Sequence, residues 1–289
     1  MKISVIVTSF NTVKLLKKHL PDIITSSDIA DEIIVADDAS EDGSFEYVKE
    51  IMLNYPKLKL LKHKTNVRFG KNSNDAVKMA KGDLVVLLNS DISPLPGYIQ
   101  PSLLHFKNPL VFGVGFAEIN HENYGQIFWK NGYLQTSPGY STSTHISGWI
   151  SGGSCIIRKD IFQKLGGFDE VYSPFYSEDL DLGYRAWKSG YQCLWEPKSK
   201  VDHQHEGTNS KFSKRFLDYV KERNRLLSVW RNITDSKMLF ENKLIILSRI
   251  LTGPNYLKIV LAAHRQIKSA KSPIVFPKLT DREIFNLFK

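Results

Sequence analysis

Four short runs of Val, Ile and Leu occur within residues 3–88, and stretches with a different periodicity separate them. The runs do not alternate apolar with polar residues, so they predict strands that are buried on both faces. In the stretches between them, apolar residues recur at helical spacing. Strands that alternate with helices predict a parallel sheet with helices on both faces. The predicted strands are 3–7 (ISVIV), 32–36 (EIIVA), 58–61 (LKLL) and 84–88 (LVVLL), and the predicted helices are 13–20, 44–55 and 74–80.

Polar residues follow three of these four predicted strands. The carboxyl ends of parallel strands meet at one edge of a sheet, and ligands of open α/β sheets bind beyond that edge. We therefore predict that these side chains converge on one binding site. They are Thr8, Ser9 and Asn11 after the first strand, Asp37 and Asp38 after the second, and Asn89, Ser90 and Asp91 after the fourth.

The carboxylates of this set suit two kinds of ligand. Asp37 or Asp38 can accept a hydrogen bond from a nucleobase N–H or a ribose hydroxyl, although the following residues 42–44 (DGS) also favour a turn and a helix cap. A phosphate-bound Mg²⁺ or Mn²⁺ takes hard oxygen ligands, and often only one or two of them come from the protein. Asp91 meets that requirement, and an Asx turn before residues 92–94 is the alternative.

From about residue 92 the pattern changes to Pro, Gly and aromatic residues with weak periodicity, which predicts a loop-rich half that shapes a pocket. Regular secondary structure is predicted again from residue 154, with a strand at 154–158 and helices at 159–165 and 177–188. Ser177 is the expected cap of the last helix, and Glu178, Asp179 and Asp181 follow it. On a helix Glu178 and Asp181 share a face, and Asp179 is turned away from them. Three acids are more than capping requires, so one of them is a candidate general base.

Two further clusters have both a functional and a structural interpretation. His203 and His205 flank one residue in a polar loop, where histidine can bind metal or play a structural part. Gly152 and Gly153 would let the backbone approach a ligand closely, and Trp149 offers an aromatic face to a sugar ring. The alternatives are a turn at the two glycines and a core position for Trp149.

Length and composition are those of an ordinary globular protein, with 289 residues of which 42% are hydrophobic and 24% charged. The amino terminus has only a short apolar run, and residues 238–263 are interrupted by charges, so we expect neither a signal peptide nor a membrane span. Cys155 and Cys193 lack metal-type spacing and lie in apolar surroundings. We therefore expect no disulfide framework and a cytoplasmic location.

The net charge of +9 is concentrated near the carboxyl end. Residues 211–289 carry 17 Lys or Arg against six Asp or Glu, whereas residues 1–210 carry 22 against 24. An apolar stripe in 212–231 predicts a basic amphipathic helix, which can lie on an anionic membrane surface or pack against the rest of the chain. Residues 244–251 and 256–263 can instead form a helical bundle or a homo-oligomer contact. The stripe consists of Phe212, Phe216, Tyr219, Val220, Leu227 and Trp230.

A series of short motifs runs through residues 1 to about 210. They are 5–11 (VIVTSFN), 33–40 (IIVADDAS), 66–74 (NVRFGKNSN), 82–91 (GDLVVLLNSD), 166–170 (GGFDE), 177–185 (SEDLDLGYR), 190–191 (GY) and the loop at His203. In this order they resemble the family 2 glycosyltransferases, and the subgroup similar to rhamnosyltransferases in particular. Each motif is short, but their number and order make the match specific.

The resemblance implies the α/β fold called GT-A, which has a Rossmann-like, mostly parallel central sheet with flanking helices. It divides the chain into a nucleotide-sugar-binding half (1–95), an acceptor-binding and catalytic half (96–210), and a basic helical carboxyl-terminal extension (211–289).

The resemblance also implies a role for each matching residue. Asp91 would bind a divalent Mn²⁺ or Mg²⁺ as the last residue of the DXD-like motif, whose first Asp is Asn89 here, and His203 would complete that metal site. Asp179 corresponds to the catalytic base, with Glu178 beside it. The nucleotide-binding residues would be Thr8, Ser9, Asn11, Asp37, Asp38, Arg68, Asp83, Asn89 and Ser90, and the acceptor-binding residues Trp149, Gly152, Gly153 and Arg185.

The expected function is inverting transfer of a sugar from a UDP- or dTDP-sugar to a hydroxyl of a glycan or lipid-linked acceptor. Such a reaction belongs to glycan or polysaccharide synthesis for the cell envelope, and it fits a peripheral position on the inner face of the membrane. A sugar nucleotidyltransferase is one alternative, but it would need a glycine-rich loop with basic residues after the first strand, which residues 7–16 (VTSFNTVKLL) lack. The other alternative is a non-catalytic protein that binds nucleotides or nucleic acid through the basic extension. That alternative leaves the acids at the strand tips unexplained.

Overall fold

The computed structural model describes residues 1–121, 123–204, 212–253, 255–271 and 273–289. A nine-stranded sheet runs through the molecule, with the order β3-β2-β1-β4-β10-β6-β11-β5 and with β9 paired to β11. The first four of these strands are parallel, as the sequence predicts, and each is one or two residues longer than predicted. They are β1 (Ile3–Ser9), β2 (Glu32–Asp37), β3 (Leu58–Lys62) and β4 (Leu84–Asn89).

Both faces of this parallel region are covered, because successive residues of each strand enter different cores. In β1, for example, Val5 and Val7 pack into one apolar cluster and Ile6 into the other. Helix α1 lies on the Val5 side and α3 packs against β1 and β2. The amino-terminal helices are α1 (Val13–Ser26), α2 (Ser44–Ile51) and α3 (Arg68–Met79). Helix α1 continues through Pro21, and α3 begins six residues before the predicted start.

The second half contains more strands than the weak periodicity after residue 92 indicates. Strand β10 is antiparallel to β4 and β6, and β11 runs parallel to β6, so distant segments extend the sheet. These elements are β5 (Ile92–Pro94), β6 (Val111–Glu118), β9 (His145–Ile146), β10 (Ser154–Arg158), β11 (Gln192–His203), α4 (Gln100–Leu103), α5 (Lys159–Lys164) and α6 (Glu178–Lys188), with short 3-10 turns at Leu104–Lys107 and Glu170–Tyr172. Both cysteines are buried and free, one in β10 and one in β11.

A separate hairpin of β7 (Tyr124–Lys130) and β8 (Tyr133–Gly139) projects from this half. Its turn is Asn131-Gly132, and both residues have positive φ, of 52° and 71°. Asn-Gly between two strands is a strong hairpin signal, because this tight turn requires two residues that tolerate positive φ. The sequence therefore carried a signal for this hairpin that our prediction missed.

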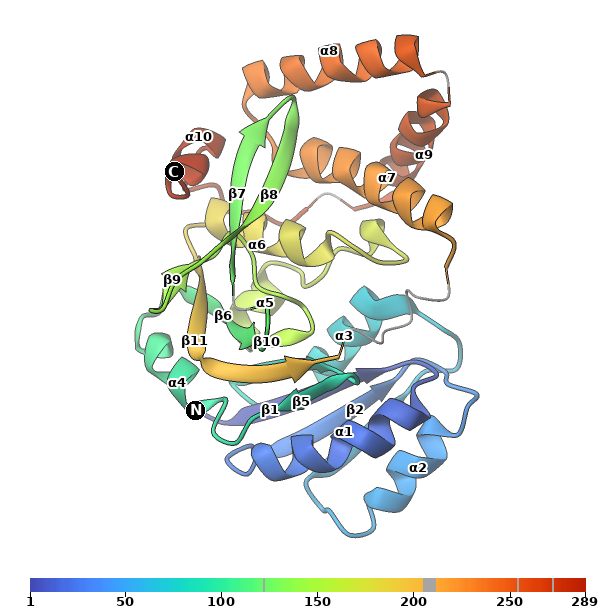
Figure 1. Cartoon of the computed structure of the whole chain (residues 1–289), viewed down its shortest axis with the longest axis vertical. Helices are drawn as coiled ribbons and strands as arrows, with labels where there is room; N and C mark the ends of the chain where they lie inside the picture. The colour runs from blue at the N-terminus through green and yellow to red at the C-terminus, as the bar shows by residue number, and fades with distance from the viewer. Residues whose placement is uncertain (122, 205–211, 254, 272) are drawn as a thin grey trace.

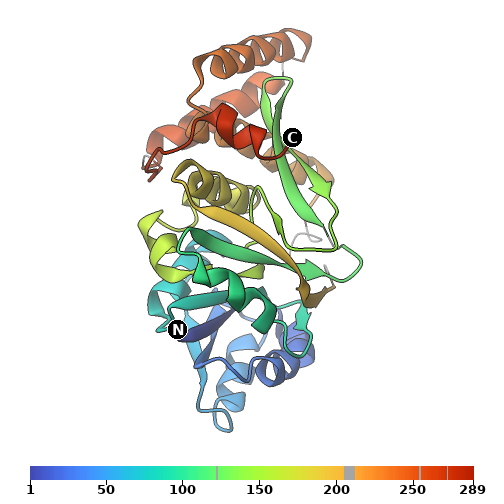
Figure 2. The same ribbon diagram turned by 90° about the vertical axis from the view of Figure 1, so that its left-hand side faces the viewer.

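Helices α7 to α10 form the described part of the carboxyl-terminal extension, around the hairpin (Figures 1 and 2). Helix α7 packs against α6, α9 and β8, and α10 contacts α6 and β7. In both views α8 lies at the opposite end of the long axis from α1 and α2. In the part of the chain that the structure describes, no helix has the length and apolar character that crossing a bilayer requires. The helices are α7 (Lys214–Asn232), α8 (Ser236–Thr252), α9 (Tyr256–Ser269) and α10 (Asp281–Asn286).

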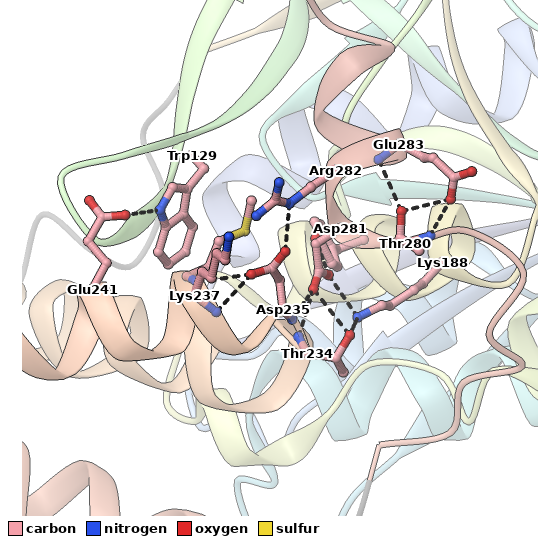
Figure 3. A network of polar contacts seen from close by, with 12 residues as sticks. Trp129, Lys188, Thr234, Asp235, Lys237, Glu241, Thr280, Asp281, Arg282 and Glu283 are labelled. Atoms are coloured by element: carbon pink, nitrogen blue, oxygen red, sulfur yellow. Dashed lines mark hydrogen bonds and ion pairs between the residues drawn. The ribbon is translucent and has the colours of Figure 1, made fainter.

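The buried carboxylate of Asp281, the first residue of α10, holds α10 against α6 and the start of α8 (Figure 3). Asp281 forms an ion pair with Lys188 of α6 at 2.8 Å and accepts hydrogen bonds from the backbone N–H groups of Thr234 and Asp235, both at 2.7 Å. Burial by itself raises the pKa of Asp281, but Lys188 and these hydrogen bonds outweigh it and lower that pKa. The carboxylate thus fixes the start of α8 against α6 and α10.

Candidate functional site

A cavity of about 310 Å³ opens at the carboxyl edge of the parallel strands. The tips of β1 and β4 border it on one side, and the first turn of α6 borders it on the other. Most of the site residues that the sequence predicts line it. They are Thr8, Ser9, Asp38, Arg68, Asn89, Ser90, Asp91, Gly152, Gly153, Glu178 and Asp179.

At one end of the cavity Asp38 organises the start of α3. Its carboxylate accepts hydrogen bonds from the backbone N–H groups of Val67 at 2.6 Å and Arg68 at 2.9 Å. Burial raises the pKa of Asp38, and these two bonds oppose the rise. Asp38 therefore ties the tip of β2 to the loop that carries Arg68, and the side of the cavity formed by these residues is polar.

The tips of β1 and β4 and the residue before β10 are in close contact at the cavity. Thr8 donates a hydrogen bond to Oδ1 of Asn89 at 3.2 Å, and the Asn89 N–H donates to the carbonyl of Gly153 at 2.9 Å. A Cβ atom at Gly153 would lie 2.3 Å from Nδ2 of Asn89. Only glycine therefore allows the backbone at residue 153 to approach the tip of β4 this closely.

A chain of ionisable groups begins at Asp91, which is 4% exposed. Nε2 of His203 lies 3.3 Å from Oδ1 of Asp91, and Nδ1 of His203 lies 3.0 Å from Oε2 of Glu118. Burial alone lowers the pKa of His203, but the two carboxylates outweigh it and raise the pKa to about 9. Glu118 ends β6, so this chain joins three strand ends across the sheet. His205 lies outside the described residues.

These groups suit a divalent cation that also binds phosphate. In the described residues, no three His, Cys, Asp or Glu side chains lie close enough together to hold a metal ion by themselves. Mg²⁺ and Mn²⁺ with a diphosphate commonly take only one or two protein ligands, and the phosphate oxygens complete the shell. The buried carboxylate of Asp91 lines the cavity and meets that requirement, and the His203 imidazole faces this carboxylate.

The opposite wall is formed by the start of α6. Ser177 precedes the helix, as predicted, but its side chain forms no capping bond because its backbone has a φ of 76°. Burial and the neighbouring Asp179 carboxylate raise the pKa of Glu178 to about 8. Burial also raises the pKa of Asp179, although hydrogen bonds from backbone N–H groups, that of Leu180 at 2.8 Å among them, oppose it. Both carboxyl groups line the cavity.

Strained backbone is concentrated around this cavity. Seven described residues other than glycine have a φ between 52° and 76°, a region that side chains with a Cβ atom seldom adopt. Asn11, Ala39, Arg68, Tyr176 and Ser177, five of the seven, lie on loops that border the cavity. Such conformations persist where the surrounding structure imposes them, and they occur most often at functional sites.

The structure places several predicted site residues away from the cavity. Asp83 is at the amino end of β4, where it accepts a hydrogen bond from the Lys2 N–H at 2.8 Å, so the length of the strand separates it from the site. Arg185 is 2% exposed and forms an ion pair with Asp181 at 2.7 Å, so its side chain belongs to the core. Trp149 lines a neighbouring cavity of about 450 Å³.

Two predicted nucleotide-binding residues border the site without lining it. Asp37 is 1% exposed and accepts a hydrogen bond from the Ser40 N–H at 3.1 Å, which stabilises the turn after β2. The backbone N–H of Asn11 donates to Oγ of Ser40 at 2.9 Å, so it joins the turns after β1 and β2.

The site also contains residues that the sequence interpretation did not single out. Glu118, which lines the neighbouring cavity and pairs with His203, could have been found, because it ends an apolar run at 111–117 just as Asp91 follows one. The aromatic residues had no such local signal, because they come from segments that are distant from one another in sequence. They are Phe10, Phe69, Phe175, Tyr176 and Phe212.

Comparison with known proteins identifies the family. The model of the family described as "Glycosyl transferase family 2" matches residues 4–166, which is more than half of the chain. The chain belongs to glycosyl transferase family 2. A relative of this family 2 transferase is the N-acetylglucosaminyl-diphospho-decaprenol L-rhamnosyltransferase of Mycobacterium tuberculosis. The two are 25% identical over 226 residues, which cover 64% of this chain and 71% of the relative.

Solved structures confirm that the transferase has the GT-A fold. GalNAc-T7, crystallised with UDP, GalNAc and Mn²⁺, superimposes with a TM-score of 0.63 at 15% identity, over 85% of this chain and 54% of that one. The mannosyltransferase PcManGT of Pyrobaculum calidifontis, in complex with GDP-Man and Mn²⁺, gives a TM-score of 0.60 at 17% identity, over 91% and 75% of the two chains. At these identities the likeness concerns the fold.

Proposed function

We propose that this family 2 transferase moves a sugar from a nucleoside diphosphate sugar to an acceptor hydroxyl with inversion at the anomeric carbon. The observation that supports this most is that Asp91 and Asp179, 88 positions apart in the sequence, line one cavity. Asp38 and Thr8 line the same cavity, at the strand tips where α/β folds bind nucleotides.

Asp91 would hold a divalent Mn²⁺ or Mg²⁺, and His203 would join it after losing the proton that its two carboxylate neighbours favour. The charge of the cation would offset the negative charge that grows on the departing diphosphate. The rest of the donor site is made by this chain's own groups. Thr8, Ser9 and Asp38 would bind the base and ribose, and the Arg68 guanidinium can add positive charge near the diphosphate.

Of the two acids at the start of α6, Asp179 is the proposed general base. Burial and the Asp179 carboxylate raise the pKa of Glu178 to about 8, so Glu178 is mostly protonated at neutral pH and adds no second negative charge beside Asp179. Asp179 takes the proton from the acceptor hydroxyl while that oxygen attacks the anomeric carbon. The bond to the diphosphate breaks in the same displacement, so no covalent sugar–enzyme intermediate forms.

The names of related proteins support a choice of donor nucleotide and acceptor. We propose a UDP- or dTDP-sugar as donor and a glycan or lipid-linked hydroxyl as acceptor, in polysaccharide synthesis for the cell envelope at the inner face of the membrane. The name of the mycobacterial relative refers to a diphospho-decaprenol. The two solved neighbours contain UDP and GDP-Man.

Thermal unfolding with a panel of nucleoside diphosphates, with and without Mn²⁺, tests the donor site. A ligand at 100 times its Kd stabilises the folded state by about 2.7 kcal/mol, which raises Tm by several degrees. We expect one diphosphate to give this shift only when Mn²⁺ is present. Turnover of the same nucleotide-sugar, followed by release of the diphosphate, then tests transfer. Release of pyrophosphate from a nucleoside triphosphate would instead identify a nucleotidyltransferase and contradict the proposal.

A further inference from the structure

Large apolar side chains are open to solvent along one side of α8. Phe240, Leu244, Leu247 and Leu251 are 63%, 51%, 55% and 77% exposed. Their spacing of four, three and four residues places them on one face of the helix. Helix α9 adds Leu257 and Leu261, which are 42% and 45% exposed and also four residues apart. The four apolar side chains of α8 are called the α8 face below.

The other side of α8 is fixed to the protein. The Glu241 carboxylate accepts hydrogen bonds from Nε1 of Trp129 at 2.7 Å and from the N–H of Gly132 at 2.9 Å. Asn242 is 1% exposed and donates to the Gly132 carbonyl at 2.7 Å. Figure 3 shows the Glu241 contact and the anchoring of Asp235 at the start of the helix. Helix α8 is therefore held with its apolar stripe facing outward, at one end of the molecule (Figure 1).

The charges beside these stripes are positive. Lys237 and Lys243 are exposed on α8, and α9 has no Asp or Glu among residues 256–269. The one acid of α8, Glu241, is bonded to the hairpin. The exposed basic residues of α9 are Lys258, Arg265 and Lys268.

This combination fits a lipid surface better than other partners. A second copy docked on the same face would bring lysines toward lysines. Nucleic acid would bind the cations but leave the exposed leucines in water. Anionic lipid offers phosphates to the lysines and an apolar layer to the leucines.

We propose that the α8 face docks on an anionic lipid bilayer, with α8 lying in the interface and not crossing it. The inference concerns binding and stands independently of the proposed catalytic activity. If the acceptor is lipid-linked, this contact also brings the transferase to the surface that carries it.

Flotation of the full chain with lipid vesicles tests the proposal. We expect binding to vesicles that contain phosphatidylglycerol and much weaker binding to phosphatidylcholine alone. Leu244→Glu with Leu251→Glu should lower binding by more than about tenfold, because each change removes a large apolar contact with the lipid. Lys237→Glu with Lys243→Glu should lower binding to the anionic vesicles alone.

A matched control is available at the other end of the molecule. Leu53 and Leu104 are 83% and 64% exposed but belong to the turn after α2 and to the 3-10 turn after α4. Leu53→Glu with Leu104→Glu should bind vesicles as the wild type does. The proposal would be overturned if both double leucine variants lost vesicle binding equally, or if the wild type did not bind vesicles. So would a wild-type dimer that becomes a monomer in Leu244→Glu with Leu251→Glu, since the face would then be a subunit interface.

Discussion

Asn224 of α7 holds the loop that leads to the proposed catalytic acids. Its side chain is 0% exposed, and its Nδ2 donates to the carbonyls of Tyr172, Phe175 and Tyr176 at 2.9, 3.0 and 2.8 Å. The amide group has only two hydrogens, so one of them is shared. The loop continues through Tyr176 and Ser177, both with positive φ, into Asp179. We expect Asn224 to keep this strained turn in place and so to act as a positioning residue for Asp179.

Asn224→Ala tests this role. Each buried carbonyl that loses its partner costs about 1–3 kcal/mol, and partial relaxation of the loop should leave a total loss of about 2–4 kcal/mol in the free energy of unfolding. A displacement of about 1 Å at a reacting group can lower a rate about a hundredfold. We therefore expect kcat to fall by about tenfold to a hundredfold. KM for the donor should stay nearly constant, because Asp38 and Asp91 keep their positions.

Asn242→Ala is the matched control. Asn242 is 1% exposed, lies in the same extension, donates to the Gly132 carbonyl and accepts from Nε1 of Trp230 at 3.1 Å. It has no contact with the loop before α6, so its loss should lower Tm and leave kcat nearly unchanged. Thermal unfolding and steady-state kinetics on both variants separate the two effects. If Asn224→Ala lowers Tm but leaves kcat at the wild-type value, the positioning role is wrong.

Three further outcomes follow from the site. Asp179→Asn should reduce transfer by about two to four orders of magnitude while donor binding, measured by calorimetry, is retained; near-normal turnover would exclude Asp179 as the base. Asp91→Ala should weaken nucleoside diphosphate binding in Mn²⁺ and change it little without metal, and an unaltered Mn²⁺ titration would count against its assignment. The raised pKa of Glu178, about 8 against an ordinary 4.5, means that the folded state keeps a proton that the unfolded state has lost. That stabilisation is complete below pH 4.5 and is lost as the pH rises to about 8, with Asp179 acting in the same direction. Glu178→Gln should flatten this decline in Tm, and a decline of unchanged slope would place its cause elsewhere.

The amino-acid sequence by itself determined the parallel half of the fold. Strands buried on both faces require continuous runs such as 84–88, and a run of this kind predicts its strand without knowledge of its neighbours. The polar residues at the strand tips followed from the same rule, because parallel strands end at one edge. For this reason Asp38, Asp91 and Asn89 were found, and the acids of α6 stood out by their local density.

The tertiary structure alone decided the rest, because it depends on contacts between distant segments. Arg185 was assigned to acceptor binding from its place in a motif, but its ion pair with Asp181 and its burial place it in the core. The pairing of β6 with β10 and β11 decides where Glu118 meets His203. Asn224 reaches carbonyls 48 to 52 positions earlier in the chain, a distance over which no local periodicity carries information.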